Sequence, residues 1–269
     1  MTQLTRICLA TTMALLAGGL SASPTWGQET GTKEAAAKTL QTLQQAWKDG
    51  LKQWRVDQNE AIKKAQESDG PMPAIRMTPP DSLTKKHLAA FGTAAKQFLG
   101  QDGAIPFYAW ILQFAPSVRD KQLINSTLET LTTVHLKSPA LHKIPKLIPW
   151  SEKLIGKHTV LSTLKLIESE NSDGSVKAAA ILARIDNDFR RAKIDSEAYA
   201  YAKKEALRAA KLTKFRSVKA HVENTIRGRE VVVKGKKAPD ISGVDLDGVA
   251  FKLSDYRGKI ILLDFWGDW

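Results

Sequence analysis

Apolar residues recur at helical spacing over most of this chain, and prolines and glycines interrupt the pattern at intervals. From Glu34 to about Glu67 they lie three and four positions apart, which predicts one long amphipathic helix. Its stripe consists of Leu40, Leu43, Trp47, Leu51 and Trp54. The Pro-rich stretch 69–80 cannot continue a helix, because proline lacks the backbone donor and clashes with the preceding turn.

Successive shorter helices are expected from Asp81 to about Ile226. Asp81 or Ser82, then Asp120, then Asp195 stand where side chains cap helix N-termini. The residues expected on inner faces include Leu83, Leu88, Phe91, Phe98, Leu99, Leu123, Ile124, Leu128, Leu131, Val134, Ile181, Leu182, Ile185 and Phe189. Pro145 and Pro149 should divide 140–150 into short pieces.

The predicted fold class is therefore mainly α, with a multi-helical domain over residues 30–228. No fixed repeat signature aligns two segments of it. A divergent solenoid and an irregular helical array remain equally compatible with the pattern.

Residues 230–269 have a different pattern. Ile241 to Leu246 and Val249 to Leu253 flank Asp247-Gly248, which predicts a β-hairpin. Ser254-Asp255 can cap a helical turn that Gly258 ends. The nearly continuous apolar run 259–265 is typical of a strand buried on both faces of a sheet.

The first 27 residues have the pattern of a secretory signal peptide. Arg6 supplies the positive charge, Ile7 to Leu20 form an apolar run too short to span a bilayer comfortably, and cleavage is expected after Gly27. An uncleaved N-terminal anchor is the alternative. The mature protein is expected to be exported to the periplasm or cell envelope, without a transmembrane span.

The net charge of +12 raises the question of an anionic partner. Lysines are scattered along predicted helices, and no run interleaves cations with aromatic residues, so a solvated basic surface is favoured over nucleic-acid binding. Acidic polymers of the envelope remain candidate partners. The five histidines show no metal-ligand spacing, and no phosphate-binding glycine loop is present, so neither a metal nor a cofactor is expected.

The C-terminal stretch resembles the start of a thioredoxin-like redoxin domain of the TlpA and AhpC/TSA kind. The residues that carry the resemblance are Ala238-Pro239-Asp240, Asp247-Gly248, Leu253 to Lys259 and Leu263 to Trp269. Peroxiredoxins share the first elements, but the Phe265-Trp266-Gly267-Asp268-Trp269 ending is closer to thiol-disulfide oxidoreductases. The resemblance implies a truncated α/β thioredoxin-like fold and protein thiols or disulfides as partners.

The resemblance also implies roles for individual residues. Asp264 would be the buried proton carrier behind the redox motif, with its pKa raised by desolvation. Trp266 and Trp269 would flank that motif, whose nucleophilic Cys is expected directly after Trp269. The one cysteine of the sequence is Cys8, inside the signal peptide, so no nucleophile is present in residues 28–269.

Three functions remain open from the sequence. One is an exported thiol-disulfide oxidoreductase, inactive over these 269 residues. Its position after Trp269 is either a selenocysteine encoded by UGA and taken as a stop, or else a nonsense mutation, a sequencing error or a fragment boundary. Another is a helical binding or scaffold protein of the envelope with a vestigial redoxin segment. A peroxiredoxin-like antioxidant is a further alternative.

Overall fold

The structure is a computed structural model. It describes residues 26–68, 71, 74, 78–231, 233 and 235–264, and within these ranges it describes side chains from Lys33 onward. The expected signal sequence up to Thr25 lies outside the described residues, as do Trp266 and Trp269. The predicted mainly α fold class is confirmed: nine α-helices and one two-stranded sheet are described. None of the described helices is both long and apolar enough to cross a membrane.

The first helices pack around a cluster of aromatic rings. The helices of this layer are α1 (Trp26–Glu67), α2 (Asp81–Gln97), α3 (Ile105–Phe114) and α4 (Lys121–Thr133), with the 3₁₀ turns η1 (Asp102–Ala104) and η2 (Ala115–Val118) between them. The Trp47 ring of α1 meets Trp110 and Phe114 of α3 edge-on, with centroids 5.5 and 5.2 Å apart. Phe91 of α2 stacks on Trp110 at 3.9 Å. The predicted tryptophan stripe therefore serves as core at Trp47.

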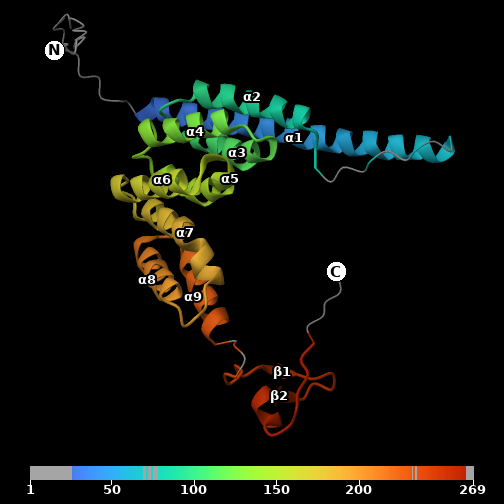
Figure 1. The fold of residues 1–269 in the computed structure, drawn as a ribbon, viewed down its shortest axis with the longest axis vertical. Helices are drawn as coiled ribbons and strands as arrows, with labels where there is room; N and C mark the ends of the chain where they lie inside the picture. The colour runs from blue at the N-terminus through green and yellow to red at the C-terminus, as the bar shows by residue number, and fades with distance from the viewer. Residues whose placement is uncertain are drawn as a thin grey trace, which may run out of the picture.

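Prolines shape the middle of the chain only partly as predicted: Pro145 starts a new segment, whereas Pro149 lies inside that segment and does not divide it. Residues 139–151 form two 3₁₀ segments, η3 (Pro139–Lys143) and η4 (Pro145–Ser151), followed by α5 (Glu152–Ile155). The helices α6 (Lys157–Glu170) and α7 (Gly174–Arg191) come next, and Asp173 caps α7 by accepting from the backbone of Ser175 and Val176. In Figure 1, α7 leads away from the first layer toward α8 (Glu197–Leu212) and α9 (Arg216–Glu230).

A cluster of ion pairs holds α6, α7 and α8 together. The Arg184 guanidinium of α7 lies 3.1 Å from Glu168 of α6 and 2.9 Å from Glu205 of α8. Arg208 of α8 donates to the same two carboxylates. The side chains of Arg184 and Glu205 are only 12% and 11% exposed, so the pair between them is shielded from solvent, whereas the Arg208 side chain is 43% exposed.

Of the three predicted helix N-caps, one is present in the structure. Asp120 caps α4, where its Oδ1 accepts from the Leu123 amide at 2.9 Å. The caps predicted at Asp81 or Ser82 and at Asp195 are wrong. Pro80 precedes α2 and supplies only its carbonyl, while the Ser196 hydroxyl accepts from the Tyr199 amide 3.2 Å away at the start of α8.

Two predicted inner positions are also wrong. Leu99 is 50% exposed and Val134 is 48% exposed. Both lie beyond the last residue of their helix, Leu99 two positions after Gln97 and Val134 directly after Thr133, so the helical stripe no longer turns them toward the core.

The predicted hairpin forms, although it is short. The strands β1 (Ser242–Val244) and β2 (Ala250–Lys252) pair antiparallel, with Gly243 opposite Phe251. The helical turn η5 (Leu253–Tyr256) follows, and Gly258 adopts a φ of +85°, as its place at the end of that turn requires. Figure 1 shows this unit beyond the end of α9.

The strand predicted over 259–265 is wrong for its described part. Residues 260–264 form no strand, and Ile260 and Leu262 are 104% and 93% exposed. A buried strand requires neighbours on both sides, and within the described residues only β1 and β2 form a sheet.

Candidate functional site

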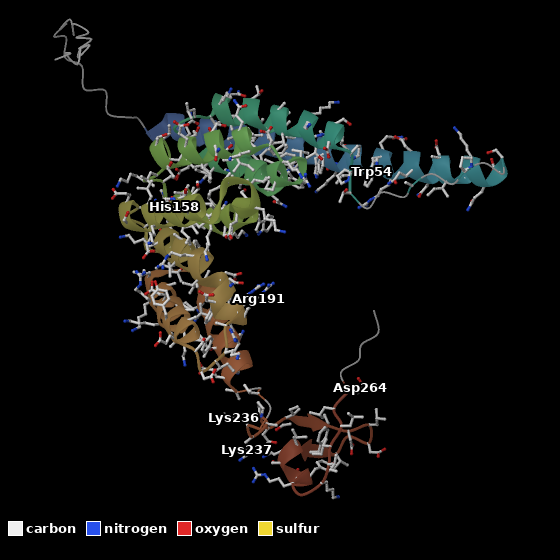
Figure 2. The ribbon with its side chains drawn as sticks, in the orientation of Figure 1. Trp54, His158, Arg191, Lys236, Lys237 and Asp264 are labelled. Atoms are coloured by element: carbon white, nitrogen blue, oxygen red, sulfur yellow. The ribbon has the colours of Figure 1, made fainter. Side chains whose placement is uncertain are left out.

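Asp264, the expected proton carrier, lies exposed after four aliphatic residues that are themselves exposed. Figure 2 shows it with the hairpin unit, apart from the helices. Trp266 and Trp269 lie outside the described residues, so the three expected site residues are not seen together. The buried role of Asp264 stays a prediction for a complete redoxin domain.

Hydrogen bonds join two of the motifs that carry the family resemblance. The Asp240 carboxylate accepts from the Ser254 amide at 2.8 Å and from the Ser254 hydroxyl at 2.9 Å. These two bonds, the amide first, hold the pKa of Asp240 below its usual value. The Leu253 amide also donates to the Ile241 carbonyl at 2.8 Å. The Ala-Pro-Asp and Leu-Ser-Asp segments are therefore parts of one local structure.

Several large apolar side chains of the C-terminal unit face solvent. They are Ile241, Val244, Leu246, Val249, Ile260, Ile261, Leu262 and Leu263. Scattered exposed aliphatics are ordinary, but a concentration of this kind marks a surface that packs against something else.

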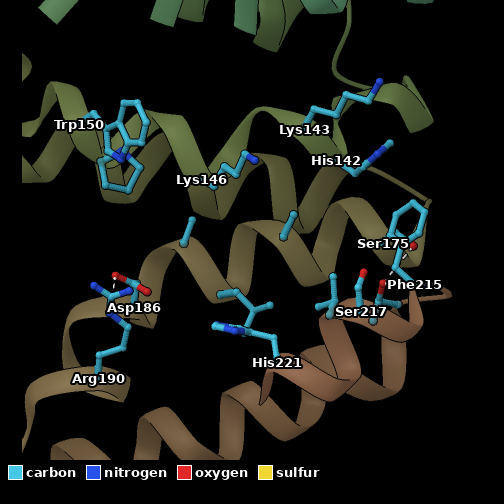
Figure 3. A pocket seen from close by; sticks show the side chains of 16 residues that line it. His142, Lys143, Lys146, Trp150, Ser175, Asp186, Arg190, Phe215, Ser217 and His221 are labelled. Atoms are coloured by element: carbon cyan, nitrogen blue, oxygen red, sulfur yellow. Dashed lines mark hydrogen bonds and ion pairs between the residues drawn. The ribbon is translucent and has the colours of Figure 1, made fainter. Parts of the chain in front are cut away.

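A second candidate site is a cleft in the helical region, with a volume of about 770 Å³. One wall is formed by η3 and η4, the floor by α7, and the other wall by the start of α9. Figure 3 shows His142, Lys143, Lys146 and Trp150 along one side, and Phe215, Ser217 and His221 along the other. We call this site the α7 cleft.

The α7 cleft combines cations with apolar surface. Lys143, Lys146 and Arg190 are exposed around it, whereas Leu182 and Val218 in its lining are half-buried. Its acidic member is Asp186, 3.6 Å from Arg190. No group of three metal-ligating side chains occurs among the described residues.

Sequence reasoning missed the α7 cleft. Its walls come from segments about seventy residues apart, near Lys146 and near Val218, and neither segment carries a catalytic motif. The available signals were the Lys-x-x-Lys pair at Lys143 and Lys146 followed by Trp150. Those residues indicate a binding cleft only together with α9, which the fold places opposite them.

Comparison with known proteins supports the redoxin resemblance over a short stretch. The chain is 46% identical over 46 residues to the thiol-disulfide oxidoreductase ResA of Geobacillus kaustophilus, and 44% identical over 46 residues to that of Geobacillus thermodenitrificans. Each match covers 17% of this chain and 26% of the relative, so the chain spans about a quarter of those proteins. No family model matches, and no solved structure matches significantly. These similarities support a thioredoxin-like relationship for part of the chain.

Proposed function

We propose that the protein functions in thiol-disulfide oxidoreduction, with residues 230–269 as the first part of its redox domain. The observation that carries this proposal is the match to two ResA enzymes. The hydrogen bonds from Ser254 to Asp240 add to it, because they join two of the segments that carry the redoxin resemblance. Both relatives are thiol-disulfide oxidoreductases, which favours this function over a peroxidase.

In a complete domain, the exposed aliphatic run Ile260 to Leu263 would become a central strand between newly formed neighbours. Asp264 would then be withdrawn from water, which raises a carboxyl pKa and suits proton exchange with a thiol near neutral pH. The nucleophile would be a thiolate, or a selenolate, directly after Trp269. It would attack one sulfur of a substrate disulfide, form a mixed disulfide and release the other sulfur as a thiol.

The decisive test is to read the codon after that of Trp269 and to express the chain continued in frame, with Cys at that position. Insulin reduction with dithiothreitol as electron donor is the readout. Asp264→Asn should slow turnover by about tenfold or more, because it removes the proton carrier. Asp247→Asn, the matched change in the hairpin turn, should leave the rate within about twofold, since Asn-Gly suits such a turn equally well. An extended, folded chain without reductase activity would remove the proposal.

Export is part of the same proposal and has its own test. Expression of the full-length gene in a bacterial host should release a mature chain that begins at Gln28, as measured by mass spectrometry of periplasmic protein. Recovery of uncleaved chain in the membrane fraction would favour the anchor instead.

A binding or scaffold role is the second candidate, and the α7 cleft is the observation that favours it. This cleft lies in the helical domain and holds none of the residues assigned to redox chemistry. Binding by the helical domain with no activity in the extended chain would support this function.

A further inference from the structure

We propose that the α7 cleft binds an extended polypeptide segment that carries apolar and acidic side chains. Binding itself is independent of the redox chemistry. The role of that segment as part of a substrate protein rests on the proposed function above.

The floor of the cleft offers contacts for apolar side chains. Leu182 and Ala183 line it, Val218 adjoins them from the α9 wall, and all three are half-buried in the free protein. Phe215 lies at one end, with its ring centroid 4.9 Å from that of His142. Trp150 lines the cleft with 56% of its surface exposed. Half-exposed aromatic residues of this kind are typical anchors of protein interfaces.

The rim of the cleft is cationic, which sets the charge of the partner. Lys143 and Lys146 project from η3 and η4 and form no ion pair within the described part of the chain. Arg190 reaches the rim from α7, and its contact with Asp186 is exposed, with side chains 54% and 57% accessible. An exposed pair of this kind contributes little, so Arg190 can exchange Asp186 for a carboxylate of the partner.

A polypeptide fits these observations better than a small molecule or a membrane. Small-molecule sites orient their ligand with a few precisely placed polar groups in an enclosed pocket. The cations here are long, exposed side chains around an open cleft, which tolerate varied acidic positions. A bilayer surface cannot follow a concavity between η4 and α9, whereas an extended chain can lie along it.

The α9 wall of the cleft is fastened to α7 in the free protein. At one end the Ser175 hydroxyl of α7 accepts from the Lys214 amide at 3.2 Å, just before α9 begins. At the other end Arg229 donates to the Phe189 carbonyl at 2.6 Å and also to the Ala192 carbonyl. Because α9 is fastened to α7 at both ends, little ordering is needed on binding.

The position of the cleft also suits delivery of a substrate to the redox segment. From His221, α9 continues for nine residues to Glu230, about 14 Å along a helix. The eleven residues 231–241 then span at most about 40 Å before β1 begins. A polypeptide held in the cleft would therefore stay within reach of the tethered redox segment, at a raised effective concentration.

The test is fluorescence anisotropy with the full chain and a fluorescein-labelled twelve-residue peptide that combines Glu with Leu and Phe. Its counterpart with Lys in place of Glu is the charge control. The Lys146→Glu and Arg190→Glu double variant should weaken binding of the acidic peptide at least about tenfold, since two attractive charges become repulsive. Trp150→Ser should weaken it about fivefold or more, and this loss should persist at high salt because it is apolar.

The matched control is Lys52→Glu, an exposed charge reversal on α1 that should leave affinity within about twofold. All altered side chains are exposed, and circular dichroism of each variant verifies that its helices are intact. Equal affinity for the two peptides, or equal losses in the cleft variants and Lys52→Glu, would overturn the proposal. The proposal would also be overturned if the cleft bound anionic phosphatidylglycerol vesicles instead of the peptide. If peptide binding holds and insulin reduction fails, the cleft remains a binding site and only its link to redox chemistry is lost.

Discussion

At the scale of single residues, Gly174 shows how closely α7 and α8 approach. A Cβ atom at this position would lie 2.3 Å from the Leu212 carbonyl oxygen, which belongs to backbone and cannot rotate away. Gly174→Ala should therefore destabilise the protein by about 1–3 kcal/mol. Thermal unfolding should show a Tm lower by about 2–4 °C for each kcal/mol lost.

Gly92→Ala in α2 is the matched control, because an added Cβ there meets no atom within 4 Å. This change should be neutral or stabilise the helix by up to about 1 kcal/mol. If both alanine variants gained stability, the close approach at Gly174 would be contradicted.

His135 is a buried titratable residue, 2% exposed, whose Nε2 has no hydrogen-bond partner. Its ring lies 5.6 Å from that of Tyr108. Desolvation lowers the pKa of His135, and the nearby charge of Asp102 opposes that shift without cancelling it. The folded protein therefore keeps this histidine neutral at a pH where the same side chain in the unfolded protein, with a pKa of about 6.5, binds a proton.

The sign of the pH effect follows from that difference. As pH falls through the unfolded pKa, the unfolded chain gains more protons, so the free energy of unfolding decreases until the folded pKa is passed. Urea unfolding at pH 7.5 and 5.5 should show a smaller loss for His135→Leu than for the wild type. The remaining histidines are common to both proteins and cancel in the comparison. Identical pH dependence in both would refute this assignment.

At the scale of helices, the ion pairs among Glu168, Arg184, Glu205 and Arg208 join three elements through side chains, and those of Arg184 are shielded from solvent. Hydrogen bonding from Arg208, followed by that from Arg184, lowers the pKa of Glu205 against an opposing desolvation. Removal of Glu205 leaves Arg184 with one ion-pair partner in a largely buried position. Glu205→Gln should therefore destabilise the protein by about 2 kcal/mol in urea unfolding at pH 7.

The exposed pair between Lys63 and Glu67 provides the comparison. Its side chains are 77% and 65% exposed at a separation of 3.8 Å, so Lys63→Ala should change stability by less than about 0.5 kcal/mol. The stability that the ionised Glu205 carboxylate contributes should also decrease at acidic pH. A carboxyl whose pKa is lowered by folding stabilises above its unfolded pKa and loses that effect as pH falls through the folded one. Equal effects of the two substitutions would contradict the importance of shielding.

At the scale of the whole molecule, we predict that the helical region and the C-terminal hairpin unfold independently of each other. The hydrophobic core clusters draw on residues 36–226 alone, and the described side chains after residue 240 are exposed or half-buried. Brief trypsin digestion should therefore cut between 231 and 241 first, where Lys236 and Lys237 are exposed. The helical product should unfold within about 2 °C of the Tm of the intact chain, since it keeps the whole core. A large loss of stability after this cut would show that the hairpin packs on the helices.

Much of the helical region was predictable because its signals are local. Helical spacing located α1 and most buried faces, Pro145 marked the start of η4, and the Asp-Gly turn located the hairpin. Errors gathered at helix ends, as at Asp195 and Val134, where one residue decides between cap, core and solvent. The strand expected over 259–265 failed for a different reason: an apolar run forms a buried strand only when other strands pair with it.

The sequence by itself determined the helical class, the hairpin and the redoxin resemblance, because each depends on residues close together along the chain. Only the tertiary structure decided which charges are shielded and that α9 lies opposite η3 and η4 to form the α7 cleft. Ser175 and Arg229 fasten α9 to α7 across about forty residues. Contacts at that separation depend on how whole helices pack, which no local spacing encodes.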